Sequence, residues 1–180
     1  MVTHIVKVNT LEIEIKSWMS ENVLFSFECE NNTLKKTVEN AIWQGADLEW
    51  ADLEGVDLTG VDLKRANLRG ADLEGADLKG ADLRGANLKQ ADLAGVNLKR
   101  ANLKGADLER ADLEGADLVG VDLKRANLKG ANLKRANLEG ADLRYTDLEG
   151  ADLKGADLKG ADLEGAFFGF GFKLTKIKED

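Results

Sequence analysis

The chain has 180 residues, with 33 acidic and 25 basic side chains and a formal net charge of −8. This acidic balance disfavours direct binding to nucleic acid, whose phosphates attract basic surfaces. No run approaches the ~20 apolar residues of a membrane span, and the first residues lack a charged segment followed by a long apolar run. Because Cys29 is the single cysteine, an internal disulfide is excluded, and we expect a cytoplasmic protein that binds neither membrane nor nucleic acid.

The first 40 residues do not carry the repeat that dominates the rest of the chain. Apolar and polar residues alternate in three short segments, which is typical of strands and predicts a hairpin or a small sheet. These segments are 2–8, 11–15 and 23–28.

A short helix is predicted near residues 33–43, just before the repeats. Leu34, Val38 and Ile42 recur there at helical spacing, and Thr33 is a suitable N-cap. We therefore expect residues 1–40 to be a capping segment, a small β/α cap that covers the open end of the repeat tract. The sequence AIWQG that follows is expected to be a degenerate first repeat, with Trp43 at its leucine position.

From residue 46 to residue 165 the chain consists of 24 consecutive pentapeptides without insertion or deletion, of the form Ala-Asp/Asn-Leu-x-x, with Val at the first position in four repeats and Thr in one. The third position is Leu in all 24 repeats, and the fifth is Gly in 16. In an α-helix, five residues advance ~500°, which would scatter the leucines over every face. In a flat strand, an odd period would send successive leucines to opposite faces. The chain must therefore turn once per repeat, with Ala and Leu inside, Asp or Asn outside and Gly at the corner.

These residues resemble the pentapeptide-repeat family, whose motif is A(D/N)LXX, and the resemblance covers 120 of the 180 residues. The five-residue period alone leaves the number of sides per coil open. The resemblance implies an all-β solenoid, a right-handed quadrilateral β-helix with four repeats per coil. Residues 41–170 would then form about six coils, with a core roughly 29 Å long at ~4.8 Å per coil.

At the C-terminal end the register continues with Phe168 at the leucine position, and the flanking phenylalanines would point outward. Residues 171–180 are expected to be a tail or a cap. This end is expected either to be covered by that segment or to make a twofold contact between two copies, as in several family members. The candidate cap or dimer contacts are Phe167, Phe170 and Phe172.

The repeat tract offers no catalytic pair. It contains no His and no Ser, and its hydroxyl residues are Thr59, Tyr145 and Thr146, so no nucleophile and base can be assembled. The outward position is Asp in 17 repeats and Asn in seven. That interchange favours local hydrogen bonds to the backbone, because acid catalysis or metal binding would single out one group of carboxylates. We expect no enzyme activity, no cofactor and no metal site.

With four repeats per coil, residues 20 apart share a side, and two opposite sides differ in charge. One side carries a cation after the leucine in five coils: Lys64, Arg84, Lys104, Lys124 and Arg144. The opposite side carries no cation in its first four coils. Its carboxylates form the candidate partner-binding surface: Asp52, Glu54, Asp72, Glu74, Asp92, Asp112 and Glu114.

The sequence predicts a non-enzymatic structural or protein-interaction module built on a rigid rod, with an unidentified protein partner. Duplication and drift of repeats, which leave a solvated face without a binding role, explain the same charge pattern. The alternative function comes from the resemblance, since some family members present a negative rod of duplex-like width to DNA topoisomerases. The acidic residues would then make the chain a DNA mimic that binds a type II topoisomerase, DNA gyrase.

Overall fold

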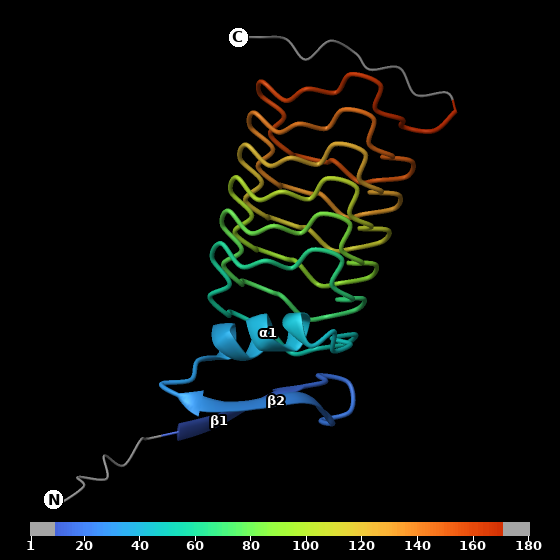
Figure 1. The fold of residues 1–180 in the computed structure, drawn as a ribbon. Coiled ribbons are helices and arrows are strands. Elements are labelled where there is room, and N and C mark those ends of the chain that lie inside the picture. The colour runs from blue at the N-terminus through green and yellow to red at the C-terminus, as the bar shows by residue number, and fades with distance from the viewer. Residues whose placement is uncertain (1–9, 171–180) are drawn as a thin grey trace, which may run out of the picture.

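Pairing between residues 20 apart organises the repeat tract into a stack of coils, shown by a computed structural model that describes residues 10–170 (Figure 1). Isolated parallel bridges join such residues throughout the tract, as between Asp52 and Asp72. The Leu53 N–H donates to the carbonyl oxygen of Asp72 at 2.8 Å. Since 20 residues are four pentapeptides, each coil has four sides. We number them by their residues in the first coil: first side 46–50, second side 51–55, third side 56–60 and fourth side 61–65.

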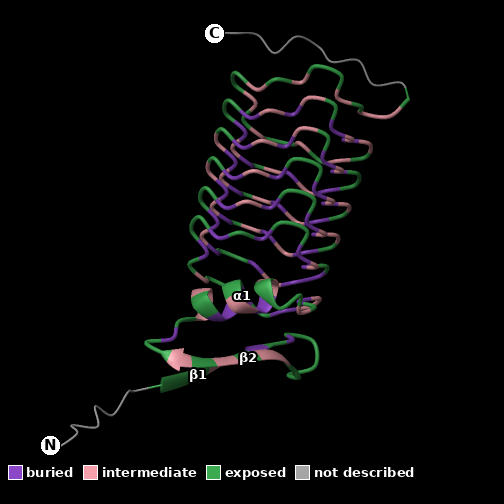
Figure 2. Cartoon of the chain, viewed as in Figure 1, coloured by how far each residue is buried: buried purple, intermediate pink, exposed green. Residues whose placement is uncertain are grey.

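Leucine and alanine columns fill the inside of the coils, and buried residues recur from coil to coil in Figure 2. Every leucine of the repeats from Leu48 to Leu148 is at most 2% exposed. Each such burial contributes roughly 1.5–3 kcal/mol relative to an exposed side chain. Thr146 is buried at an alanine position, and its hydroxyl donates to the carbonyl oxygen of Leu143 at 2.6 Å. In the last coil Leu153, Leu158 and Leu163 are only half-buried, because no further coil within residues 10–170 covers them.

The fifth position of each repeat makes the corner. A hydrogen bond closes each turn, as from the Ala71 N–H to the Leu68 carbonyl oxygen at 3.1 Å. The residue before the donor has a positive φ, +62° at Gly70, and type II turns favour glycine at this third turn position. Eight repeats place another residue there in the same conformation, and Arg110 has φ +58°. A left-handed conformation costs such residues roughly 1–2 kcal/mol.

The N-terminal segment is a hairpin followed by a helix. Strands β1 (Thr10–Lys16) and β2 (Val23–Glu30) pair antiparallel, with a bulge after Ile15. Helix α1 (Leu34–Trp43) begins after Thr33, whose hydroxyl accepts a hydrogen bond from the Lys36 N–H at 3.2 Å. The first strand predicted from the sequence, at residues 2–8, lies outside the described residues.

The expected degenerate repeat AIWQG is not a repeat. Ala41 to Trp43 form the last turn of α1, and Trp43 is 83% exposed instead of pointing inward. The helix ends at Gln44, and Gly45 with φ +70° redirects the chain into the first coil. Local helical hydrogen bonds therefore override the five-residue register at this point, and the coils begin at Ala46.

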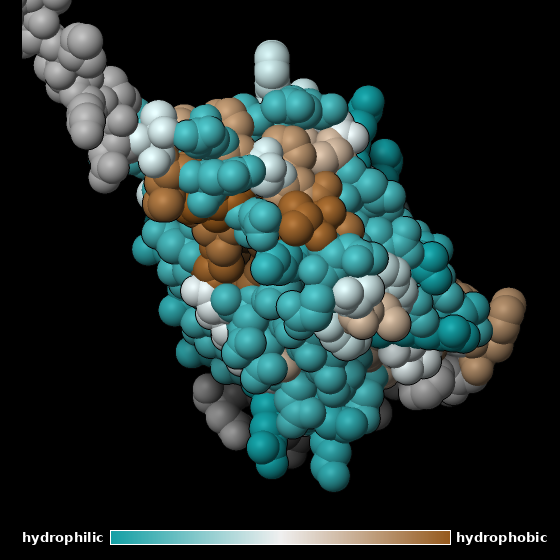
Figure 3. Space-filling model, turned by 90° about the horizontal axis from the view of Figure 1, so that it is seen from below, coloured by the Kyte–Doolittle hydropathy of each residue, from teal (hydrophilic) through white to brown (hydrophobic). Residues whose placement is uncertain are grey.

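The hairpin and α1 lie against the first coil. The Asp52 N–H donates to the Lys16 carbonyl oxygen at 2.8 Å, and the Trp18 N–H donates to the Trp50 carbonyl oxygen at 3.0 Å. Figure 3 views this end and shows apolar side chains gathered between hydrophilic ones. None of the helices within residues 10–170 has the length and apolar character needed to cross a membrane. The exposed large apolar residues of the N-terminal segment are Leu11, Trp18, Met19, Val23 and Trp43.

Candidate functional site

The seven carboxylates singled out from the sequence all lie on the second side of the rod. Its four aspartates are joined by bridges in successive coils, so they stand in one column at steps of ~4.8 Å. Three glutamates follow two residues later in the first, second and fourth coils, and Ala94 takes that position in the third. All seven side chains are half-buried or exposed. We call this set the acidic side: Asp52, Glu54, Asp72, Glu74, Asp92, Asp112 and Glu114.

No ion pair between residues 10–170 involves the acidic side. The first cation further along the second side is Lys134, and its ammonium lies 3.3 Å from Asp152, beyond the acidic side. Neighbouring carboxylates of the column are closer than the Debye length of ~8 Å at physiological ionic strength. Their fields therefore add along the rod, which favours a positively charged ligand or partner.

Three cations of the opposite, fourth side, Lys64, Arg84 and Arg144, pair with aspartates of that side. Lys64 lies 2.7 Å from Asp62 and 3.3 Å from Asp82, and Arg84 lies 2.7 Å from Asp82. The hydrogen bond from the Arg84 guanidinium lowers the pKa of Asp82 to about 2. The charge difference across the rod therefore arises from unpaired carboxylates on the second side more than from free cations on the fourth.

The aspartates and asparagines also have a structural role. In each of the 24 repeats, the side-chain Oδ1 accepts a hydrogen bond from the backbone N–H two residues later, at 2.9–3.4 Å. This confirms the local backbone bonding inferred from the interchange of Asp and Asn. On the acidic side the same aspartates therefore support the turns and leave the second carboxylate oxygen, Oδ2, free.

Asparagine has a second role that the sequence reasoning missed. The Asn87 amide donates to Oδ1 of Asn67 at 2.9 Å, and the Asn132 amide donates to Oδ1 of Asp112 at 3.0 Å. Three further asparagines do the same to the residue 20 positions earlier: Asn67, Asn97 and Asn127. Where an asparagine stands in such a column, its amide bonds to the side chain 20 residues earlier, and two carboxylates are not stacked against each other. In the acidic side, the first three aspartates are each followed by another aspartate instead.

The candidate contacts at the C-terminal end are partly described. Phe167 is 40% and Phe170 is 98% exposed, and their rings meet edge to face with centroids 5.9 Å apart. Phe168 packs partly buried against the leucine core, as its position in the register predicts. Phe172 lies outside the described residues.

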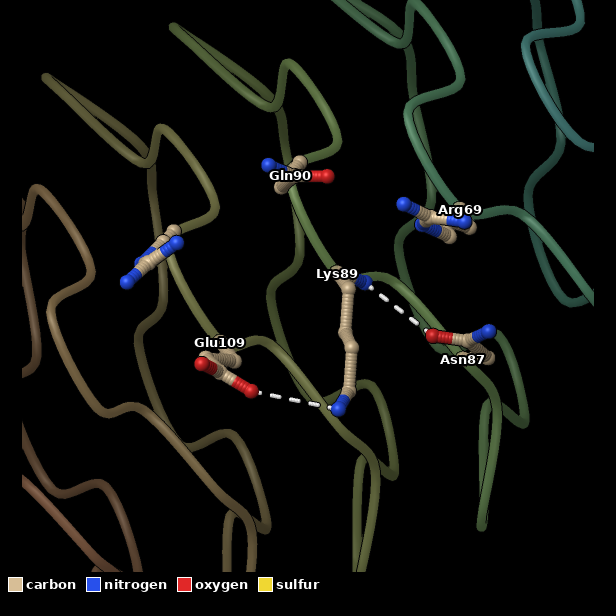
Figure 4. Close-up of a pocket in the computed structure, with 6 residues that line it drawn as sticks. Arg69, Asn87, Lys89, Gln90 and Glu109 are labelled. Atoms are coloured by element: carbon tan, nitrogen blue, oxygen red, sulfur yellow. Dashed lines mark hydrogen bonds and ion pairs between the residues drawn. The ribbon is translucent and has the colours of Figure 1, made fainter.

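A polar hollow of about 450 Å³ lies where the first and second sides meet (Figure 4). In the figure, Lys89 extends toward Glu109, and these groups are 3.1 Å apart. The residues that line the hollow are Arg69, Asn87, Lys89, Gln90, Glu109 and Arg110. The sequence reasoning missed this hollow, because it forms between repeats whose neighbours are known only once the coil has four sides.

Within residues 10–170, no three His, Cys, Asp or Glu side chains are grouped so that they could hold a metal ion. Cys29 is a free, half-buried thiol. His4 lies outside the described residues. In the described part of the chain, the geometry thus offers rows of fixed charges and no assembled catalytic group.

A four-sided solenoid of five-residue repeats, with leucine inside and charged rows outside, defines a class of repeat protein. The family described as pentapeptide repeats matches the chain with eight copies, at residues 38–70, 62–100, 91–130 and 131–169. The chain belongs to this pentapeptide repeat family. Its fold is accordingly the family's right-handed quadrilateral β-helix.

Solved structures of other pentapeptide repeat proteins resemble this chain. One is a pentapeptide repeat protein from the cyanobacterium Cyanothece 51142, with 36% identity over 66% of this chain and 88% of that chain, and a TM-score of 0.49. HetL from Nostoc sp. strain PCC 7120, which is involved in heterocyst differentiation regulation, is 38% identical over 70% of this chain and 73% of its own, with a TM-score of 0.33. QnrB1, a plasmid-mediated fluoroquinolone resistance protein, is 24% identical over 64% of each chain, with a TM-score of 0.40. No curated protein matches the sequence.

Proposed function

We propose that the chain is a non-enzymatic protein-interaction module whose acidic side binds a basic surface of a protein partner in the cytoplasm. The supporting observation is that its seven carboxylates have no cation partner within residues 10–170. On the other three sides, several lysines and arginines pair with carboxylates of the same or the next coil, such as Lys64, Lys89 and Lys99. Charge complementarity across such an interface raises the association rate and selects the partner.

Charge reversal tests this proposal. Glu54→Lys, Glu74→Lys and Glu114→Lys are combined in one variant that reverses the outer row of the acidic side. A matched control carries the same charge change on the other three sides, as Glu139→Lys, Glu149→Lys and Glu164→Lys. Quantitative affinity purification should recover a protein that the native chain and the control retain and the acidic-side variant loses. If no protein distinguishes the variant from the control, the row is a solvated face and the proposal fails.

A second candidate partner is a type II topoisomerase, DNA gyrase. The unbroken column of stacked carboxylates favours it, because a DNA-binding surface is basic and recognises closely spaced negative charges. A supercoiling assay with purified enzyme should then show inhibition, or protection from a quinolone, at micromolar protein. The acidic-side variant should lose the effect, and the control should keep it. No effect of the native chain would remove this candidate and leave the general proposal standing.

We further propose that residues 1–40 act as a cap on the first coil, which the end of α1 completes, that the β-helix expected over 41–170 begins at Ala46, and that 171–180 form a tail or cap. The backbone bonds from Asp52 to Lys16 and from Trp18 to Trp50 support the N-terminal role, since they pair groups that an uncovered coil would expose. Removal of residues 1–40 should lower the unfolding temperature and promote association. An unchanged melting curve would contradict the capping role.

The exposed rings of Phe167 and Phe170 are proposed to make a contact at the C-terminal end, within the chain or with a second copy. Sedimentation velocity distinguishes a contact within the chain from a contact between two copies. It is measured for the native chain and for a double variant that carries Phe167→Ser and Phe170→Ser. A dimer that dissociates in the double variant indicates a twofold contact. A monomer at high concentration removes the dimer, and equal stability of the native chain and the variant would then remove the cap as well.

A further inference from the structure

The hollow at the meeting of the first and second sides holds two polar groups without partners. Three cations and one carboxylate line it, and the neighbouring Asp107 also pairs with Lys89 at 3.2 Å, so that Arg110 is the one lining cation outside every ion pair between residues 10–170. Glu109 is engaged by Lys89 at 3.1 Å, and Arg69 contacts Glu49 at 3.1 Å. No hydrogen bond or ion pair between residues 10–170 uses the side chain of Gln90 or Arg110. Gln90 and Arg110 line the hollow together with Arg69, and Figure 4 shows Gln90 and Arg69 on neighbouring coils.

The unused groups occupy a strained position. Gln90 and Arg110 are corner residues of consecutive coils, with φ +58° at each, where 16 of the 24 repeats have glycine. Only one other pair of corner residues 20 apart in the repeat tract lacks glycine at both positions, namely Arg125 and Tyr145. Strain of this kind is characteristic of functional sites, where the side chain is needed in that place.

We propose that this hollow binds a diphosphate group. The guanidinium groups of Arg69 and Arg110 start from coils two steps apart, ~10 Å along the rod. A single phosphate bound at one of them leaves the other unused, whereas two linked phosphates present oxygens to both. Guanidinium groups donate paired hydrogen bonds to phosphate oxygens. The Gln90 amide adds further donors, and Lys89 lines the same hollow with its ammonium held by Asp107 and Glu109.

Calorimetric titration of the native chain with inorganic pyrophosphate tests the site. Saturable binding is expected, together with shifts of the backbone amide NMR signals of Asn87 to Arg110. Orthophosphate should bind more weakly. A parallel titration with ADP distinguishes a nucleotide from free diphosphate as the ligand. Tighter binding of ADP than of pyrophosphate would indicate a nucleotide, and equal affinity would indicate free diphosphate. Absence of saturable binding, or equal affinity for orthophosphate and pyrophosphate, would overturn the proposal.

Glycine substitutions supply variants that keep the fold. Arg110→Gly combined with Gln90→Gly introduces the ordinary corner residue, so the melting temperature should be unchanged or higher. The affinity for pyrophosphate should fall roughly tenfold or more, because charge-assisted hydrogen bonds are lost. The matched control is Arg100→Gly, since Arg100 is a left-handed, exposed corner arginine on the opposite corner. Equal loss of affinity in the control would show general charge attraction and contradict a defined site.

Discussion

A corner side chain of this rod leans over the glycine 20 residues later. A Cβ atom built at Gly120 would lie 3.8 Å from Cγ of Arg100, and one built at Gly130 would lie 3.5 Å from Cγ of Arg110. At Gly70 a Cβ atom would overlap the ring of Trp50. Glycine at such positions therefore has two functions, a positive φ and room for the side chain of the preceding coil.

Two glycine substitutions separate these functions. Gly75→Ala should cost roughly 1–2 kcal/mol of unfolding free energy from the left-handed φ of +63° alone, because nothing lies within 4 Å of the added Cβ. Gly70→Ala has nearly the same φ and should cost clearly more, since the ring of Trp50 must move. Urea denaturation of both variants measures the difference. Equal costs would contradict the packing of Trp50 on Gly70.

Inward and outward positions of one repeat should differ sharply in their effect on stability. Leu108 is fully buried in the fourth coil, so Leu108→Ala should cost roughly 2–5 kcal/mol through lost burial and the cavity left behind. Lys104 is exposed and outside every ion pair between residues 10–170. Lys104→Ala should change stability by less than about 0.5 kcal/mol. Chemical denaturation that gave equal effects would contradict the assigned columns.

At the scale of one side, the fourth side should make stability depend on pH. The Arg84 guanidinium lowers the pKa of Asp82 to about 2, from an ordinary value of 3.8. A group whose pKa is lower in the folded state stabilises the fold when ionised, so its contribution is present above about pH 4 and lost as the pH falls toward 2.

Asp82→Asn tests this pH dependence, because the fold accepts asparagine at the same position in seven repeats. The urea midpoint of the variant should lie below that of the native chain at pH 6, and the difference should shrink as the pH falls from about 4 through 2. Arg84→Ala removes the main cause of the shifted pKa and should flatten the same profile. A difference that stays constant from pH 2 to pH 6 would exclude ionisation of Asp82 as its source.

The inward or outward direction of each position within a repeat could be predicted from the sequence, whereas the contacts between coils could not. A period of five with leucine at every third position fixes which residues point inward, and the buried leucines from Leu48 to Leu148 confirm it. The bonds from Asn87 to Asn67 and the overlap of Trp50 with Gly70 depend on neighbours 20 residues apart. Those neighbours are defined only when the coil has four sides, and the period leaves that number open.

The start of the rod shows the other limit of sequence reasoning. Trp43 fits both a helix and the leucine column, and the two patterns overlap over AIWQG. The helix is favoured because Thr33 caps its first turn and because Val38 and Ala41 are buried in the same core as the coils. The sequence around Trp43 therefore cannot decide between a helix and a repeat, because both structures bury the same neighbouring residues.

At the scale of the whole molecule, each coil rests mainly on the coils before and after it, so the rod should tolerate a change of length. In such repeat proteins, stability is approximately a sum over coils and their interfaces. Removing residues 86–105 deletes one whole coil and stacks the second coil on the fourth. Each side keeps its identity, because Asp72 then pairs with Asp112 on the acidic side. Removing residues 86–90 deletes one repeat, which also preserves the core but moves every later residue to the preceding side.

Both shortened chains should therefore fold, and they should differ in function. The 20-residue deletion should unfold cooperatively with a smaller dependence on urea concentration, because less surface is buried, and it should keep the partner of the acidic side. The five-residue deletion should fold with similar β structure but lose that partner, because Asp92 and Asp112 move to the first side and the carboxylate column is divided.

A deletion of residues 86–88 is the control, since it takes the leucines out of register and should prevent folding. Circular dichroism and the affinity purification described above measure both outcomes. Failure of the 20-residue deletion to fold would contradict the dependence of each coil on its neighbours alone.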